Sequence, residues 1–97
     1  MKNYKIKLPD DFNEYAWEIE SKGCLEIDIE IYANVYTFNF YDPVRLNQTI
    51  QDDLDSNQYF FYENMVVIPS VNIENIESFI KNIINTPYLT SFNIKTN

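Results

Sequence analysis

Three residue types that most enzyme sites depend on are absent or nearly absent from this chain. Among its 97 residues there is no histidine, one cysteine and one glycine. Without histidine, the chain lacks the commonest general base, the commonest zinc ligand and the base of any Ser–His or Cys–His pair. One cysteine forms no disulfide within the chain, and one glycine makes no Gly-rich phosphate loop. We therefore expect no catalytic residue, no metal site and no cofactor.

Basic side chains are also scarce. The chain has 7 Lys and Arg residues against 15 Asp and Glu residues, and its formal net charge is −8. Proteins that bind nucleic acids contact the phosphates through Lys and Arg, so their interfaces are basic. The charge balance therefore excludes nucleic acid as an expected partner.

Long apolar runs are missing as well. No stretch approaches the roughly 18 consecutive apolar residues that read as a membrane-spanning helix. The N-terminus carries Lys2, Lys5 and Lys7, but no apolar core of signal-peptide length follows them. We expect a cytoplasmic protein that makes no contact with a membrane.

The composition is that of a folded domain. Hydrophobic residues make up 45% of the chain and aromatic residues 16%, which is enough to build a core at this length. No linker, repeat or low-complexity tract divides the sequence. We expect one compact domain over residues 1–97.

Residues 12–21 fit two structures. Their apolar side chains recur at the i, i+3, i+4 and i+7 positions of an amphipathic helix, which would end at Gly23. The side chains from Tyr15 to Ile19 also alternate as in a strand, and a tight turn would then place Trp17 opposite Ile27. The hairpin aligns one apolar face throughout, and we favour it over the helix.

The remaining elements follow from alternation, helical spacing and capping residues. The patterns predict strands over 25–31 and 35–41, a helix from Pro43 behind an Asp42 N-cap, short strands over 59–62 and 65–68, a helix over 73–84 capped by Asn72, and an edge strand or docked tail over 88–94. Hairpins dominate this order, so we expect an α+β fold with a mainly antiparallel sheet and two or three helices packed on one face. The expected core consists of Ile27, Ile29, Phe38, Phe40, Leu46, Ile50, Val67, Ile76 and Ile80.

The negative charge is concentrated in the middle of the chain. Residues 10–63 carry 13 of the acids against only Lys22 and Arg45, whereas residues 64–97 are neutral. Like charges that face each other on a strand, or that gather at the C-terminal end of a helix, reduce stability. Their retention points to a surface that meets a basic partner, because complementary potentials speed association and discourage wrong partners.

Two acidic clusters are the candidate partner-binding sites. The first lies on one face of the predicted strand 25–31, joined in the hairpin by two acids of the neighbouring strand. The second lies near the end of the helix that starts at Pro43. An apolar anchor beside the acids is also expected, because Trp and Tyr dominate binding energy at interfaces. The candidate residues are Glu18, Glu20, Glu26, Asp28 and Glu30 in the first cluster, Asp52, Asp53 and Asp55 in the second, and Trp17 as the anchor, unless it is buried on Ile27.

Two stretches of the chain resemble known proteins. Residues 40–50, FYDPVRLNQTI, and residues 63–69, ENMVVIP, followed by the helix at 73–76, resemble a group of small bacterial proteins of uncharacterised function. In its size, acidity and α+β character the chain also resembles the immunity proteins of contact-dependent growth inhibition systems. That second resemblance implies a protein that binds and blocks a toxin domain, often a basic nuclease.

Three functional hypotheses remain. We favour an immunity or inhibitor protein, because occluding an active site requires no catalytic residue. The alternative is a small acidic secretion-type chaperone, although those proteins are normally longer and dimeric. A small enzyme built on paired carboxylates is the third, but glycoside cleavage of that kind usually needs a deep cleft in a larger chain.

Overall fold

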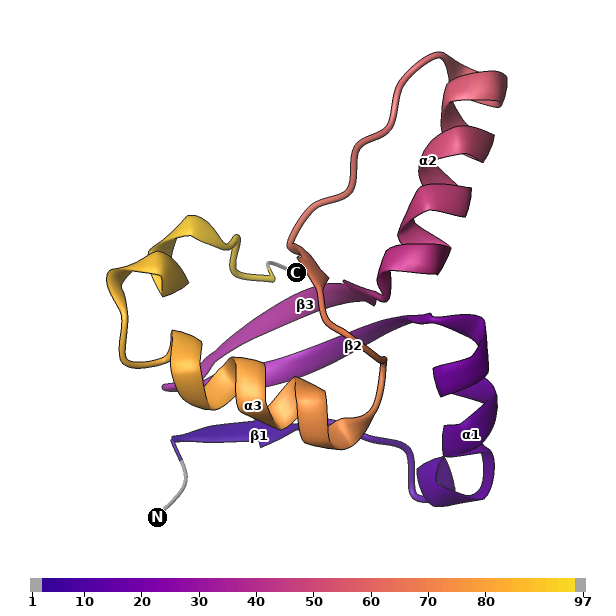
Figure 1. Ribbon diagram of the computed structural model, residues 1–97. Coiled ribbons are helices and arrows are strands. Elements are labelled where there is room, and N and C mark those ends of the chain that lie inside the picture. The colour runs from indigo at the N-terminus through magenta and orange to yellow at the C-terminus, as the bar shows by residue number, and fades with distance from the viewer. Residues whose placement is uncertain (1–2, 96–97) are drawn as a thin grey trace.

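The computed structural model describes residues 3–95, and Figure 1 shows how their helices and strands are arranged. In chain order the elements are β1 (Tyr4–Ile6), α1 (Phe12–Lys22), β2 (Cys24–Ile31), β3 (Asn34–Tyr41), α2 (Pro43–Asn57), β4 (Met65–Val67), α3 (Ile73–Ile83) and a 3₁₀ helix (Pro87–Ser91). The strands form one sheet in the order β1-β2-β3-β4, antiparallel except between β3 and β4. The predicted α+β class and the mainly antiparallel sheet are confirmed.

The core lies between the central hairpin of the sheet and α3. The strands β2 and β3 pair over 8 residues each, and their alternation turns one apolar face toward α3, which lies across the sheet (Figure 1). Rings and branched aliphatic side chains interlock there, with Phe38 in the middle. The expected core residues that prove buried are Ile27, Ile29, Phe38, Phe40, Ile76 and Ile80.

Three other residues expected in the core are not buried. Val67 is 45% exposed, because its neighbours in the chain, Val66 of β4 and Ile68 just after it, face inward instead. Leu46 and Ile50 are half-buried, because α2 does not pack on the sheet as predicted. It leaves the sheet and projects away from it (Figure 1).

Residues 12–22 form the helix α1, so the favoured hairpin is wrong and the helical alternative is correct. Gly23 follows the helix in the left-handed conformation, with φ at +76°, and its N–H donates to the carbonyl oxygen of Ile19 at 3.0 Å. This is the common way for a helix to end at a glycine. The place beside β2 that the hairpin would have filled is taken by β1. The strand β1 pairs with β2 only over Ile29–Ile31 of β2.

A side chain at Gly23 should be destabilising. The backbone N–H of Asp42 donates to the Gly23 carbonyl oxygen at 2.8 Å, and a Cβ at Gly23 would collide with the Asp42 carboxylate. That carboxylate caps α2 by accepting from the N–H of Arg45 at 2.7 Å. Forcing a side chain into the left-handed region costs about 1–2 kcal/mol, and a disturbed N-cap costs about 1 kcal/mol more.

Urea denaturation of Gly23→Ala should therefore show a free energy of unfolding about 2–3 kcal/mol below that of the parent. Ser21→Ala is the matched control, because Ser21 is exposed on α1 just before the turn. It should change the stability by no more than about 0.5 kcal/mol. A Gly23→Ala variant as stable as this control would contradict the structure of the turn.

The C-terminal part of the chain differs from the prediction in one strand. Residues 59–62 form no strand, whereas Met65–Val67 forms β4. Of the two alternatives for residues 88–94, the docked tail is correct. The Asn64 side chain holds the tail by donating to the carbonyl oxygens of Thr37 and Asn93, at 3.1 and 2.8 Å, and by accepting from the N–H of Asn93 at 2.8 Å.

Candidate partner-binding surfaces

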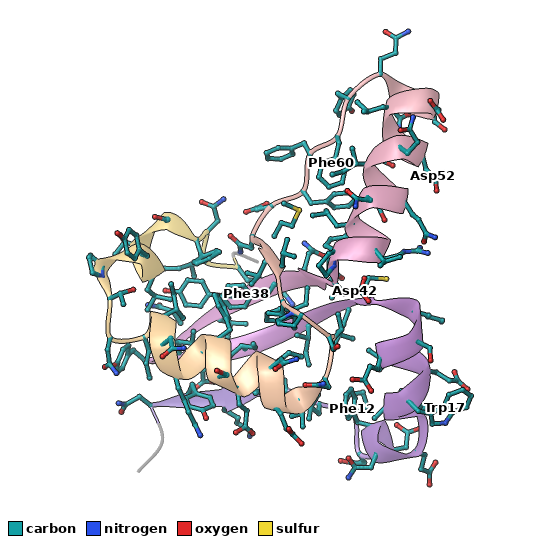
Figure 2. All side chains as sticks on the ribbon, in the orientation of Figure 1. Phe12, Trp17, Phe38, Asp42, Asp52 and Phe60 are labelled. Carbon is teal, nitrogen blue, oxygen red and sulfur yellow. The ribbon has the colours of Figure 1, made fainter. Side chains whose placement is uncertain are left out.

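The residues predicted to bind a partner lie on three separate elements. Those of α1 do not join the face of β2, as the hairpin would have required. Figure 2 shows Trp17 and Asp52 pointing outward from different parts of the molecule. The three groups are Trp17, Glu18 and Glu20 on α1, Glu26, Asp28 and Glu30 on β2, and Asp52, Asp53 and Asp55 on α2.

The acids of β2 lie on the face of the sheet opposite the core, but lysines from both ends of the chain lie among them. Lys5 of β1 is the cross-strand partner of Glu30. Lys95 Nζ lies 2.8 Å from Asp28 Oδ2, and Thr37 Oγ1 donates to Asp28 Oδ1 at 2.6 Å. Opposite charges on neighbouring strands stabilise a sheet by about 0.2–1 kcal/mol. The repulsion expected on this strand is therefore relieved in part within the chain.

The pairing of Asp28 makes stability depend on pH. Hydrogen bonds from Lys95 and then Thr37 hold the pKa of Asp28 below its usual value, and the charge of Lys7 adds to the effect. A carboxyl whose pKa is lower in the folded than in the unfolded state adds stability above its unfolded pKa of about 4. That contribution is lost as the pH falls through the lowered, folded pKa.

Asp28→Asn should remove this pH-dependent contribution. Between about pH 7 and pH 2, its free energy of unfolding should fall less than that of the parent, by about 1 kcal/mol or less, because the ion pair is partly exposed. Urea denaturation at both pH values measures the difference. Glu26→Gln is the control, because Glu26 lies on the same strand and makes no ion pair within residues 3–95. Equal pH dependence in parent and Asp28→Asn would contradict the pairing.

A hollow of about 570 Å³ opens beside this face, between α1 and β2. Apolar side chains of α1 line one side of it. Its two carboxylates, Glu26 and Asp28, are accompanied by two lysines, Lys7 and Lys95. The hollow therefore carries no excess of either charge and offers no particular attraction to a basic partner.

On α1 the predicted anchor is exposed and one of the acids is engaged. Trp17 is 66% exposed and points away from the sheet (Figure 2). Glu20 accepts a hydrogen bond from Asn72 Nδ2 at 2.9 Å, which ties α1 to the N-cap residue of α3. Glu18 is exposed and lies beside Trp17 in the chain. The hairpin interpretation, which buried Trp17 on Ile27, is excluded.

The helix α2 and the segment that returns from it, residues 58–64, form a projecting arm (Figure 1). The arm comprises residues 43–64. The structure describes every residue of α2, and none of them is buried. Phe60 of the returning segment turns toward α2 (Figure 2), and its ring centroid lies 5.2 Å from that of Tyr62. At the base of the arm Tyr62 meets Tyr41 of β3, with ring centroids 6.0 Å apart.

Asp52, Asp53 and Asp55 lie in the outer half of this arm. Within residues 3–95 none of them takes part in an ion pair, and Asp55 accepts only from Gln51 Nε2, at 3.2 Å. The last turn of α2 has no basic residue, and Asp55 in that turn opposes the helix dipole. Unlike Asp28 of β2, which pairs with Lys95, these three therefore keep their charge available to a partner, with Asp52 and Asp55 exposed and Asp53 half-buried.

Two aromatic residues of the arm were not predicted as site residues. Tyr59 is 68% exposed and Phe61 is 75% exposed. Both belong to the aromatic run 59–62, which the sequence pattern assigned to a short strand. The four consecutive aromatic residues could have revealed these exposed side chains. Successive side chains of a strand point to opposite faces, so a strand with one buried face would leave two of the four exposed.

Among the residues that the structure describes, no group of His, Cys, Asp or Glu side chains is placed to hold a metal ion. Over the same residues, no helix combines the length and the apolar character that a membrane crossing requires. Comparisons with protein-family models, with curated proteins and with solved structures give no significant match to the chain. Function is therefore inferred from the surfaces themselves.

Proposed function

We propose that this chain is a non-catalytic inhibitor of the immunity-protein type, which acts in the cytoplasm by binding and neutralising a basic toxin domain. The observation that carries the proposal is the acidic cluster of the arm. Asp52, Asp53 and Asp55 lie on α2, which projects away from the sheet (Figure 1), and they have no cationic partner within residues 3–95. A surface that retains such a cluster at a cost to its own helix is suited to a basic partner.

A nuclease is the class of toxin domain that fits this surface best. Enzymes that bind RNA or DNA present Lys and Arg to the phosphates, so their active-site clefts are basic. An acidic protein that enters such a cleft excludes the nucleic acid and is drawn to the cleft by the same charges. Neutralisation of this kind needs no catalytic group, metal or cofactor on the inhibitor.

Co-expression with the protein encoded by the neighbouring gene tests the proposal. We expect a basic toxin domain to co-purify with the chain as a stable complex and to be inactive while bound. A neighbour that co-purifies as a secreted effector and keeps its activity would favour the chaperone alternative instead. A neighbouring toxin domain that does not bind the chain would contradict the proposal.

A further inference from the structure

The apolar residues of the arm are exposed to a degree that the fold does not explain. The large apolar side chains that stay exposed on the arm are Val44, Leu54, Tyr59, Phe61 and Tyr62. Exposed apolar side chains gathered on one element mark surfaces that contact another molecule. Because the arm projects from the sheet, a partner can reach it from several sides (Figure 1).

Charge and apolar surface lie on different strips of the same arm. Asp52 points outward from α2 (Figure 2), whereas Tyr59 and Phe61 belong to the returning segment. Interfaces commonly combine a desolvated aromatic anchor with a polar and charged rim. The arm alone carries both parts, without any contribution from β2.

We infer that the arm enters a concave site on the basic partner, with Tyr59 and Phe61 as its apolar anchors and Asp52, Asp53 and Asp55 meeting the basic rim. This inference rests on the proposed function and names the surface through which that function is exerted. It replaces Trp17, the anchor expected from the sequence, with two residues on a different element. The partner site must therefore have an apolar floor as well as basic walls.

A second copy of this chain does not fit as the occupant. The arm, residues 43–64, contains four acids and one basic residue, Arg45, and the whole chain has a net charge of −8. Two arms brought together would confront like charges, which costs association free energy. A basic partner removes that cost and neutralises the carboxylates that oppose the dipole of α2.

The test measures the affinity of arm variants for the basic toxin domain that co-purifies with the chain. The double variant Tyr59→Ser with Phe61→Ser should raise Kd about 30-fold or more, as expected for anchor residues, and mainly through faster dissociation. Since the lost contact is apolar, the effect should persist in high salt, where exposed charges are screened. Circular dichroism should show the double variant folded.

Two matched controls distinguish an anchor from a generally exposed aromatic residue. Tyr88 is 67% exposed on the 3₁₀ helix, and Trp17 is 66% exposed on α1. Tyr88→Ser and Trp17→Ser should leave Kd within about 2-fold of the parent value, as substitutions outside an interface do. A further measurement uses the parent chain without any substitution. The amide hydrogens of residues 58–64 should exchange more slowly when the chain is in the complex.

The outcomes separate the inference from the proposed function. If the parent chain binds its partner, the double variant binds equally well and residues 58–64 gain no protection, the inference is overturned and the proposed function stands. A Trp17→Ser variant that alone weakens binding would return the anchor to α1. If the parent chain does not bind the toxin domain at all, both the proposed function and the inference are contradicted.

Discussion

Replacing Asp52, Asp53 and Asp55 together with lysine should slow association with the basic partner by about 10- to 1,000-fold at low ionic strength. Long-range attraction between opposite surfaces raises the association rate constant, and reversal of three charges weakens that attraction and makes the arm itself locally basic. The difference should shrink in high salt, because the Debye length is about 8 Å at physiological ionic strength. Stopped-flow measurements at two salt concentrations give both rate constants.

The same triple variant should fold at least as well as the parent. Asp55 lies in the last turn of α2, where an acid opposes the helix dipole and a lysine complements it by about 0.3–1 kcal/mol. The free energy of unfolding should therefore stay unchanged or rise slightly. Weaker binding by an equally stable protein is the signature of a surface kept for a partner.

A second triple variant with the same change in net charge shows which surface forms the interface. Replacing Glu18, Glu26 and Glu30 with lysine alters the net charge by the same amount but leaves the arm untouched. We expect it to slow association much less than the arm variant does. A larger effect than that of the arm variant would move the interface to β2 and α1. If neither variant alters affinity or association rate, the acidity serves solubility only and the inhibitor proposal loses its main support.

The largest loss of stability is expected from Phe38→Ala. Phe38 is fully buried at the centre of the core, and its ring centroid lies 5.8, 5.6 and 5.1 Å from those of Phe40, Phe79 and Phe92. Removing a buried ring costs about 3–5 kcal/mol, because the neighbours cannot close the cavity. In a domain of about 5–15 kcal/mol total stability that is a large share. Urea denaturation of the two proteins gives the difference.

Phe61→Ala is the control for this measurement. The same chemical change at a side chain that is 75% exposed should alter the free energy of unfolding by no more than about 0.5 kcal/mol. A loss below about 1 kcal/mol in Phe38→Ala would contradict the described core. A loss above that value in Phe61→Ala would mean that the arm packs on the body of the protein.

The central hairpin was predictable because its side-chain alternation is long and uninterrupted. Residues 12–21 were not, because their apolar side chains satisfy the periods of both a helix and a strand. The structure decides between them through β1, which takes the place beside β2 that the hairpin would have filled. A strand of three residues, Tyr4–Ile6, carries too little periodicity to be recognised, and its pairing is a long-range contact.

The composition of the candidate site was predictable, but its electrostatics were not. The sequence identifies both acidic clusters, yet it does not reveal that Lys95, from the far end of the chain, pairs with Asp28. Only the folded arrangement shows that Asp28 of the first cluster is paired, whereas no acid of the second cluster forms an ion pair within residues 3–95.

The arm was missed for a related reason. An apolar stripe such as Leu46 and Ile50 usually indicates a helix packed on a sheet. In this protein the stripe is only half-buried, and α2 leads away from the sheet with the returning segment beside it. The aromatic run 59–62 follows the helix back along the arm instead of joining the sheet as a strand.

Neutralisation itself is tested most directly by titration. The purified chain is added in steps to the toxin domain encoded beside its gene, and the activity of that domain is recorded at concentrations well above Kd. Activity should fall in proportion to the added chain and vanish at an equimolar ratio, since each bound chain occludes one active site. Undiminished activity in the presence of excess chain would contradict the inhibitor proposal.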